Sequence, residues 1–412
     1  MSAGDRSPHD GGAKDDASQR SEASKGGRMQ RQAAAFAMTA ILVAGVAAER
    51  LWAQRGTHQS QLSGTIRTYY IAADEVDWNY APANHDHMTG KPYDERARYW
   101  TEKGPDRIGP IYRKAVYHEY TDASFTTLKA RPAAWEHLGV LGPVIRGEVG
   151  DTIKVVFKNH ARFPFSVHAH GVKYDERSAG VDPVQQGATF TYTWEVVPSA
   201  GPQPGEPSSK LWLYHSHVNE QRDVAAGLLG PMLISAKGTL KPDGTPRDVD
   251  REFVVILYTL DEQQSPYLDA NIAQHIESPH TLKKTQPVFV DIDGQPVNVG
   301  FPLTNFRETI NGYQFGNTPG LTMTEGEHVR WYAAGMAGPH ILHWHANTVL
   351  LGNSSVDVVP LLPAEMHTTD MIAQSPGTWM IHCHFEGHLA LGMYGHYTVE
   401  PAKKTRVITQ ER

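Results

Sequence analysis

One short stretch near the C-terminus carries the residue types best suited to chemistry, namely His382, Cys383, His384, His388 and Met393. The apolar residues just before it predict a β-strand that runs into the stretch. Because alternate side chains of a strand share a face, Cys383 should point away from its two histidine neighbours and toward His388 and Met393. Two histidines, a thiolate and a weak axial thioether form the ligand set of a blue copper centre. We therefore predict a copper centre at Cys383, with the flanking histidines serving a different metal on the far side of the strand.

A lone cysteine is most often a small buried apolar residue, so this prediction depends on the rest of the chain. Cys383 is the only cysteine among 412 residues, whereas 22 residues are histidine. Histidines recur at the same spacing at His168 with His170, at His215 with His217, and at His343 with His345, the last pair preceded by His340. Each pair on a strand projects to one face, so four strands could bring eight imidazoles to one cavity. Imidazole suits copper, zinc, iron and nickel alike, so the cysteine centre is what selects copper.

Composition narrows the class of protein. A chain of 412 residues is long enough for two domains with a sizeable core. The formal net charge of −7 provides no basic surface for nucleic acid, so we expect no nucleic-acid partner. The 37 glycines and 27 prolines, spread along the chain, indicate many turns and an all-β fold. The single cysteine excludes an intrachain disulfide.

The N-terminal residues have the features of a targeting segment. Residues 1–28 are polar and without periodicity, which predicts disorder. Arg28 and Arg31 precede the apolar run 33–48, which is short for a membrane span and ends in small residues. We therefore interpret residues 29–48 as a signal peptide, with an uncleaved anchor as the alternative, and predict an exported protein, periplasmic or secreted. The rest of the chain contains no spanning segment, so no stable membrane span is expected once the signal is removed.

Strand and turn patterns divide the remainder into two similar halves. The linker 238–250, rich in proline, glycine and aspartate, separates a predicted first domain, 62–238, from a predicted second domain, 251–402. Each half contains an early and a late His-x-His pair. The corresponding segments are 150–171 with 326–347, and 211–234 with 378–399. Such self-similarity indicates a duplicated β-barrel or sandwich unit.

The order of these motifs resembles that of the multicopper oxidases. From His168 to Met393 the motifs read HxHG, HxH, HxxHxH and HCHxxxHxxxxM. The segments GPDRIGPIYRKAVYHEYTD, 104–122, and INGYQFGNTPGLTM, 310–323, further resemble the ceruloplasmin-like members, and the likeness covers about 66–400. The resemblance implies an all-β protein of two tandem cupredoxin-like domains, each a Greek-key β-barrel or sandwich.

The resemblance also implies which residues bind copper, with four ions per chain. The type 1 ion would be held by His340, Cys383, His388 and the axial Met393. The type 2 ion would be held by His168 and His343. The two type 3 ions would be held by His170, His215 and His384, and by His217, His345 and His382. In the first domain Ser216 stands where Cys383 stands in the second, so the first domain should carry no blue copper.

The implied activity is that of an oxidase. A reducing substrate would supply single electrons at the type 1 centre, and dioxygen would be reduced to water at the other copper ions. Cys383 would connect the two places through its neighbours His382 and His384, which makes these three the catalytic residues. The substrate stays open between phenols or aromatic amines, as in laccases, and Fe(II) or Mn(II), as in ferroxidases.

A partial likeness to an iron site bears on that choice. Residues 267–275 resemble the iron-binding stretch of ceruloplasmin-like ferroxidases and retain Asp269 and His275, but Ala270 replaces one expected acid. Another expected acid, before the type 1 histidine, is also absent, although Glu386 is adjacent. Oxygen ligands suit hard cations, so Asp269, His275 and Glu386 form a candidate site for a substrate metal. The alternative is a solvated polar loop.

The distribution of ligands predicts an assembly. In six-domain relatives the copper cluster lies where the last domain closes onto the first. A chain of two domains can rebuild such a ring as three copies joined head to tail, which predicts a homotrimer with clusters between subunits. The alternative is a monomer whose domains face each other across the linker.

Two other functions are alternatives to the oxidase. A two-domain copper nitrite reductase pairs a type 1 centre with one type 2 ion and needs no cluster of eight histidines. A non-catalytic interaction module similar to the clotting-factor A domains would tend to lose ligands, and none of the expected twelve is lost here.

Overall fold

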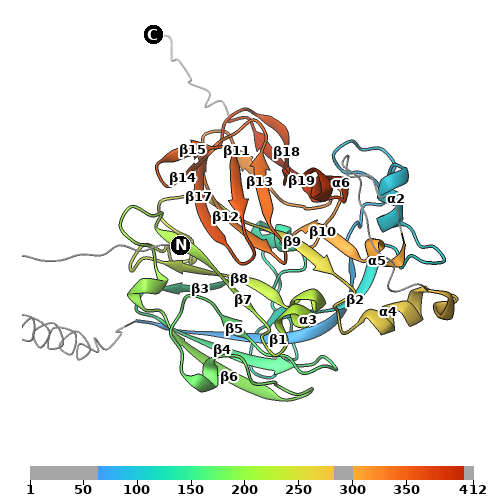
Figure 1. The fold of residues 1–412 in the computed structure, drawn as a ribbon. Coiled ribbons are helices and arrows are strands. Elements are labelled where there is room, and N and C mark those ends of the chain that lie inside the picture. The colour runs from blue at the N-terminus through green and yellow to red at the C-terminus, as the bar shows by residue number, and fades with distance from the viewer. Residues whose placement is uncertain (1–63, 283–299, 403–412) are drawn as a thin grey trace, which may run out of the picture. The chain divides into compact units, whose positions relative to one another are not determined.

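The computed structural model describes residues 64–282 and 300–402, which lie within one unit, Ser63–Arg412. The segments predicted to be disordered, 1–28, and to be a signal peptide, 29–48, lie outside the described residues, so both stay predictions. Strands dominate the described part, and the helices are short (Figure 1). Within these ranges no helix has the length and apolar character needed to cross a bilayer.

The strands of the first half form two four-stranded sheets. One sheet has the order β2 (Ile111–Tyr120), β1 (Ile66–Asn79), β4 (Thr152–Asn159), β6 (Thr189–Glu195). The other has the order β3 (Ile145–Glu148), β8 (Leu229–Ser235), β7 (Ser209–His215), β5 (His168–Ala169). The histidine pairs of this half therefore begin on neighbouring strands, β5 and β7.

The strands of the second half form a six-stranded and a five-stranded sheet. The six-stranded order is β10 (Phe306–Ile310), β9 (Arg251–Asp261), β12 (His328–Met336), β17 (Met366–Ile372), β14 (Val349–Leu351), β15 (Ser354–Val356). The five-stranded order is β11 (Thr322–Thr324), β19 (Tyr394–Glu400), β18 (Gly377–Cys383), β13 (His340–Trp344), β16 (Val358–Leu361). Here too the histidine motifs lie on neighbouring strands, β13 and β18.

The pairing pattern is the same in both halves. β1 pairs in parallel with β4 and antiparallel with β2, just as β9 pairs with β12 and β10. β8 lies between β3 and β7, as β19 lies between β11 and β18. β5 borders β7, as β13 borders β18. The predicted all-β fold is confirmed, and the sequence repeat corresponds to a repeat of strand order.

Alternation of residue types explains which face each outer strand buries. In β4, Ile153, Val155 and Phe157 are buried, whereas Lys154 and Lys158 are only partly covered. This period of two matches the alternation of side chains on a strand. β8 and β9 break the rule, because they are buried along almost their whole length.

A shared apolar core accounts for the fully buried strands and joins the two halves. On β9, Phe253 and Val255 pack into the core of the second half. Val254 and Ile256 point the other way and pack with residues of β7 and β8 from the first half. Burial of apolar surface contributes about 25 cal/mol per Å² removed from water, so a continuous core fixes the halves against each other.

A buried ion pair lies at the same junction. Lys114 on β2 and Glu262, just after β9, are both fully buried and bonded to each other. The Lys114 ammonium also donates to the Ala225 carbonyl oxygen at 2.9 Å, and the Tyr80 hydroxyl donates to Glu262. Removing one partner of such a pair leaves an uncompensated buried charge, which costs about 3–5 kcal/mol.

Short helices fill the connections. The α-helices are α2 (Glu95–Thr101), α3 (Glu220–Ala226), α4 (Leu268–His275), α5 (Phe301–Thr304) and α6 (Glu386–Ala390). The 3-10 helices are η1 (Ala133–Leu138), η2 (Glu176–Ser178), η3 (Pro198–Ala200) and η4 (Pro279–Thr281). α3 follows β7 and α6 follows β18, so each late histidine pair is followed by a helix and then by the next strand.

Candidate metal sites

The structure brings three of the four predicted ligands of the type 1 centre, Cys383, His340 and His388, close together. Its sulfur lies 3.5 Å from Nδ1 of His388 and 4.0 Å from Nδ1 of His340, and those two nitrogens are 3.2 Å apart. When ligand atoms bind one metal ion at about 2.0–2.3 Å, the distances between the ligand atoms themselves are similar to these three separations. The three side chains therefore fit a single metal ion without rearrangement of the backbone.

The chain positions this centre through one turn. β18 ends at Cys383, and the amide of Cys383 donates to the carbonyl oxygen of Met393 at 3.0 Å. The amide of Met393 donates to the carbonyl oxygen of His388, also at 3.0 Å. Gly392 permits the turn, because its φ of 100° is strained for residues with a side chain. Cys383 and Met393 are both fully buried in the core of the second half, on the side opposite to His382.

Burial sets the protonation of the centre. It raises the pKa of the Cys383 thiol and lowers the pKa of His340 to about 4, since both charged forms lose water. His340 is therefore neutral at pH 7 and available as a ligand, whereas the thiol must lose its proton when a metal binds. The amide of Ile341 lies 3.5 Å from the cysteine sulfur and is placed to stabilise the thiolate.

A buried carboxyl that the sequence reasoning missed lies beside the centre. Oε2 of Glu308 is 3.9 Å from Nδ1 of His388 and accepts a hydrogen bond from the Thr259 hydroxyl at 2.8 Å. Burial raises the pKa of Glu308 to about 7. Glu308 lies on β10, within no motif, so only the pairing of β10 with β9 could have revealed it.

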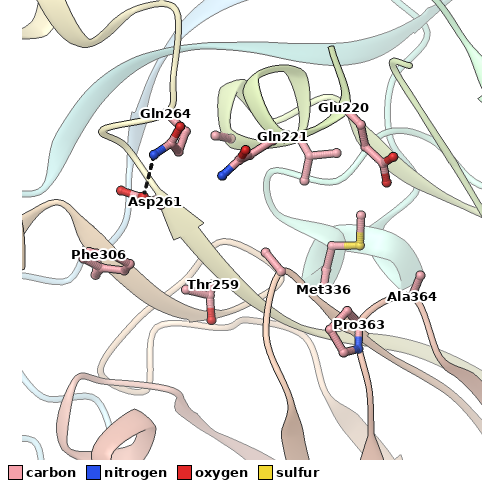
Figure 2. Close-up of a pocket in the computed structure, with 12 residues that line it drawn as sticks. Glu220, Gln221, Thr259, Asp261, Gln264, Phe306, Met336, Pro363 and Ala364 are labelled. Carbon is pink, nitrogen blue, oxygen red and sulfur yellow. Dashed lines mark hydrogen bonds between the residues drawn. The ribbon is translucent and has the colours of Figure 1, made fainter. Parts of the chain in front are cut away.

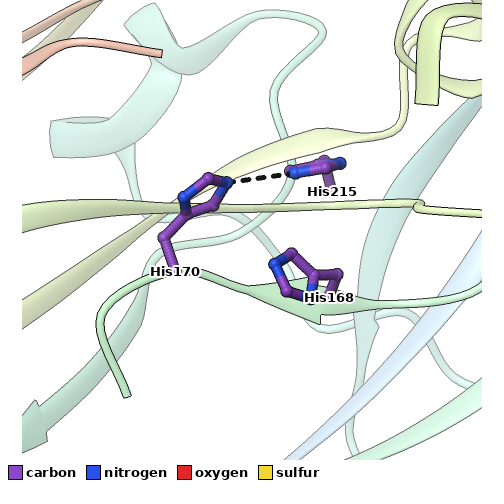
Figure 3. Close-up of side chains that lie close together, drawn as sticks. All are labelled: His168, His170 and His215. Carbon is purple, nitrogen blue, oxygen red and sulfur yellow. Dashed lines mark hydrogen bonds between the residues drawn. The ribbon is translucent and has the colours of Figure 1, made fainter. Parts of the chain in front are cut away.

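The first-half histidines form a second group. β5 and β7 pair so that His168 lies opposite His215, and Figure 3 shows His170 turned toward His215. The Nε2 atoms of His170 and His215 are 3.1 Å apart, and the His217 ring stacks on the His168 ring at 4.8 Å. Burial lowers the pKa of His170 and of His215 to about 4, so both imidazoles are neutral at pH 7.

An acidic side chain, also missed from the sequence, borders this group. Oε2 of Glu220 lies 3.3 Å from Nδ1 of His217 and its other oxygen lies 4.0 Å from Nε2 of His215. Glu220 is the first residue of α3 and is exposed. It joins His215 and His217 as a set of possible metal ligands within 4.8 Å of one another.

The second-half histidines form a third group on the outer face of the five-stranded sheet. Nε2 of His382 lies 3.2 Å from Nδ1 of His343 and 3.1 Å from Nε2 of His345. The ring of His384 contacts those of His343 and His382 at 5.2 Å and 5.6 Å. Burial lowers the pKa of His382 to about 4, and its Nδ1 lies 2.8 Å from the Cys383 carbonyl oxygen. The predicted division of β18 into a cysteine face and a histidine face is therefore present in the structure.

The eight histidines do not meet at one place within the described chain. The potential ligand groups contain histidines of the first half or of the second half, and none combines the two. Within residues 64–282 and 300–402, no ring contact joins the first-half group to the second-half group either. Each group supplies half of the predicted cluster.

The candidate substrate-metal residues lie on two different helices. Asp269 and His275 are on α4, and the exposed Glu386 begins α6. Burial and the nearby Lys103 ammonium lower the pKa of His275, and the Asp77 carboxylate opposes this shift. None of the ligand groups found among the described residues contains Asp269, His275 or Glu386.

A cavity of about 560 Å³ lies between α3 and the strands that lead to the Cys383 centre. Figure 2 shows side chains of α3 on one side of it and Met336 with Pro363 on the other. The Met336 carbonyl oxygen lies 3.2 Å from Nε2 of His340, and Thr259, which bonds to Glu308, also lines the cavity. The cavity thus adjoins the ligands of the cysteine centre.

Fold and ligand groups together define the class of protein. Two profiles described as multicopper oxidase match the chain, one at residues 119–239 and the other at residues 284–403. The chain belongs to the multicopper oxidase family, whose members bind copper.

The relatives include ceruloplasmin-type proteins. The chain is 40% identical to "Ferroxidase HEPHL1" of Mus musculus over 357 residues, which are 82% of this chain and 30% of that protein. It is 35% identical to ceruloplasmin of Homo sapiens over 348 residues, 82% of this chain and 31% of that protein. The chain thus spans under a third of the length of these relatives. The blue copper oxidase from Nitrosomonas europaea shares the fold, with a TM-score of 0.51 at 18% identity over 82% of this chain and 86% of that one.

Proposed function

We propose that this protein is a multicopper oxidase that couples one-electron oxidation of a reducing substrate to the four-electron reduction of dioxygen to water. The observation that carries the proposal is the double role of β18. Cys383 joins His340 and His388 on one face of the strand, and its neighbour His382 joins His343 and His345 on the other face. Two metal sites are thereby linked through a single peptide bond.

The donor sets support copper at both places. The soft thiolate of Cys383 with two imidazoles and the buried Met393 suits a type 1 ion, for which His340, Cys383, His388 and Met393 are the proposed ligands. We assign His168 and His343 to a type 2 ion. We assign His170, His215 and His384 to one type 3 ion and His217, His345 and His382 to the other. When bound, the four copper ions would supply the one-electron and dioxygen chemistry.

The protein's own residues prepare the sites for these ions. Burial lowers the pKa of His170, His215 and His382 to about 4 and keeps them neutral at pH 7, so these three rings need not lose a proton before they bind. Carbonyl oxygens fix the orientation of several rings, as the Ala179 oxygen does for Nδ1 of His168 at 2.6 Å. Such partners select the tautomer that directs the other nitrogen toward a metal.

We propose that the complete cluster forms between chains of a homotrimer. The first-half and second-half histidine groups are separate within one chain, which favours completion by another copy. A head-to-tail contact between the first half of one chain and the second half of the next closes as a ring when the rotation matches a threefold.

We propose the cavity between α3 and β9 as the place where the reducing substrate approaches the cysteine centre. The carboxylates of Glu220 and Asp261 line it, which favours a cationic substrate such as Fe(II) or Mn(II). The name ferroxidase carried by a relative at 40% identity supports the same substrate class. The cavity volume of about 560 Å³ is also large enough for a phenol or an aromatic amine.

Oxygen uptake by the copper-loaded protein tests the proposal. We expect dioxygen consumption with at least one of Fe(II), Mn(II), a phenol and an aromatic amine, supplied separately, with water as the product. The same sample should show an intense blue band and a near-ultraviolet shoulder. Blue protein without the shoulder and without oxygen uptake would indicate a type 1 centre alone, and colourless loaded protein would overturn the proposal.

A further inference from the structure

A further histidine group lies outside the sites described above. His85 and His87 form another His-x-His pair in the loop between β1 and α2, and His396 lies on β19. The His87 ring contacts both of the others, with centroid distances of 5.2 Å to His85 and 5.3 Å to His396. The two imidazoles of the cysteine centre are separated by a similar 5.1 Å. Two segments far apart in the sequence therefore bring three imidazoles together.

A carboxylate between the first two histidines holds the loop in place. Oδ1 of Asp86 accepts hydrogen bonds from the amides of Met88 at 2.8 Å and Thr89 at 3.2 Å. Oδ2 accepts from the Tyr394 hydroxyl at 3.0 Å. Tyr394 precedes His396 by two residues on β19, so this bond fixes the loop beside His396. Asp86 therefore fixes the position of the loop, and the three imidazoles are the side chains that could bind a metal ion.

The ring nitrogens are available for a metal ion. Nδ1 of His396 is buried and has no hydrogen-bond partner among the described residues. Leaving such an atom unpaired destabilises the folded protein, and a bound ion would offset that cost. Nδ1 of His85 lies 2.8 Å from the Ala83 carbonyl oxygen, so the neutral ring donates there and presents Nε2 as a ligand. His87 is exposed and gives access from solvent.

A methionine lies beside the group on the same face of the sheet. Met380 on β18 is directly opposite His396 on β19, and opposite residues of an antiparallel pair project to the same side. On the other side of Met380, the amide of His345 donates to the Met380 carbonyl oxygen at 3.0 Å. A row of metal-binding side chains thus runs from His345, just after β13, through Met380 on β18 to His396 on β19. Thioether and imidazole ligands together favour Cu(I) over harder cations.

We propose that His85, His87 and His396, with Met380 beside them, form an additional binding site for a soft univalent metal ion of the Cu(I) class. The three rings follow one another with His87 in the middle, so binding requires the half-buried His85 ring and the exposed His87 ring to turn toward His396. The site is independent of the oxidase activity, because none of its histidines belongs to the proposed copper cluster or the cysteine centre.

Anaerobic titration tests the proposal on the reduced, copper-loaded protein after a chelator has removed loosely bound metal. Cu(I) is added against a chelator of known affinity, and we expect one further equivalent to bind per chain. His87→Ala should weaken that binding about 100-fold. His280→Ala, which removes an exposed histidine of η4, is the matched control and should leave it unchanged. The absence of a further equivalent in the unmodified protein, or its retention in His87→Ala, would overturn the proposal.

A second variant tests the metal class. Met380→Leu keeps an apolar side chain of similar size, so the sheet should fold as before. We expect about a tenfold loss of Cu(I) affinity with unchanged binding of Zn(II), which needs only the imidazoles. Equal Cu(I) affinity in Met380→Leu and the unmodified protein would overturn the assignment to soft ions.

Discussion

The segments β7–α3–β8 and β18–α6–β19 have the same backbone frame and different chemistry. In the first half the amide of Ser216 donates to the carbonyl oxygen of Leu228 at 3.2 Å. In the second half the amide of Cys383 donates to the carbonyl oxygen of Met393 at 3.0 Å. Serine and cysteine therefore occupy the same place, as do leucine and methionine.

The equivalence extends to the remaining ligand positions. The amide of Leu228 donates to the Asp223 carbonyl oxygen at 3.2 Å, as that of Met393 does to His388 at 3.0 Å. Asp223 thus stands where the second half has the proposed ligand His388. The Ser216 hydroxyl donates to the Asp223 carboxylate at 2.6 Å, so the first half has a buried hydrogen bond where we propose a metal centre in the second half.

The fourth pair of equivalent residues lies in the segment whose backbone amide contacts Ser216 in the first half and Cys383 in the second half. The amide of Ser166 donates to the serine hydroxyl at 3.0 Å, and the amide of Ile341 lies 3.5 Å from the cysteine sulfur. The residues just before them are Phe165 and His340. One backbone frame therefore supports either an apolar and hydrogen-bonded core or the proposed metal site, and the two halves differ at four side-chain positions of this frame.

Cys383→Ser copies the first-half residue into the second half and has the largest expected effect. Loss of the thiolate should abolish the blue band and reduce substrate oxidation to background, while the histidine groups still bind copper. The matched control is Ser216→Cys, which should leave the spectrum unchanged because Asp223 and Phe165 stand where imidazoles are needed. Visible absorption and oxygen uptake measure both. A Cys383→Ser protein that stays blue would place the centre elsewhere.

Asp223→Ala tests the structural counterpart of the metal centre. The change removes the acceptor for the Ser216 hydroxyl, for the Asn219 amide at 3.1 Å and for the Arg222 guanidinium at 2.8 Å. We expect the free energy of unfolding of the metal-free protein to fall by about 2–4 kcal/mol, measured with urea. His388→Ala, the equivalent change, should cost the metal-free protein about 1 kcal/mol or less. Equal losses of unfolding free energy in the two variants would contradict the idea that a hydrogen-bonded core in the first half takes the place of the proposed metal site in the second half.

Acid should destabilise both halves of the metal-free protein. Burial lowers the pKa of His215 and of His382, which occupy equivalent positions, to about 4. In the unfolded chain a histidine titrates near about 6.5, so between these values the unfolded state binds more protons. The free energy of unfolding should therefore fall as the pH decreases from about 6.5 to about 4.

The size of this slope can be assigned to single residues. His215→Gln and His382→Gln should each reduce the slope by about 1.4 kcal/mol per pH unit within that window. Urea unfolding at several pH values measures it. A slope unchanged in both variants would mean that these rings are protonated in the folded state.

The smallest effect is expected at the candidate substrate-metal residues. Replacing Asp269, His275 and Glu386 together by Ala should slow Fe(II) oxidation a few-fold, if these residues guide a metal ion toward the centre. Oxidation of a bulky phenol should change little, since its electrons need only reach His388. Asp261→Asn changes a carboxylate that lines the cavity and serves as the comparison. It should also slow the oxidation of Fe(II) more than that of the phenol. Equal losses with both reductants, or none with either, would favour a solvated polar loop.

The local spacing of residues was enough to predict which side chains of each motif lie close together. Because side chains alternate along a strand, the order His382, Cys383, His384 is enough to predict that the cysteine and the two histidines face different partners. His388 and Met393 lie within one turn of the chain, so their approach to Cys383 follows from short-range spacing as well.

Contacts that depend on the packing of distant strands could not be predicted. Glu308 reaches the cysteine centre only because β10 pairs with β9. Asp223, which takes the place of the proposed ligand His388, lies on α3, and the sequence of α3 has little similarity to that of α6. The approach of His87 to His396 likewise joins two segments from opposite ends of the described chain. The separation of the eight histidines into two groups follows from the apolar core between the halves, which no single motif encodes.

Native mass spectrometry with copper counting in the same sample tests most directly whether two chains complete each cluster. After loosely bound copper has been removed with a chelator, we predict a trimer with four copper ions per chain that consumes dioxygen. Since metal bridging the interface would stabilise the assembly by mass action, removal of the copper should shift the trimer toward monomer. A monomer that holds four copper ions and consumes dioxygen at the full rate would contradict the account.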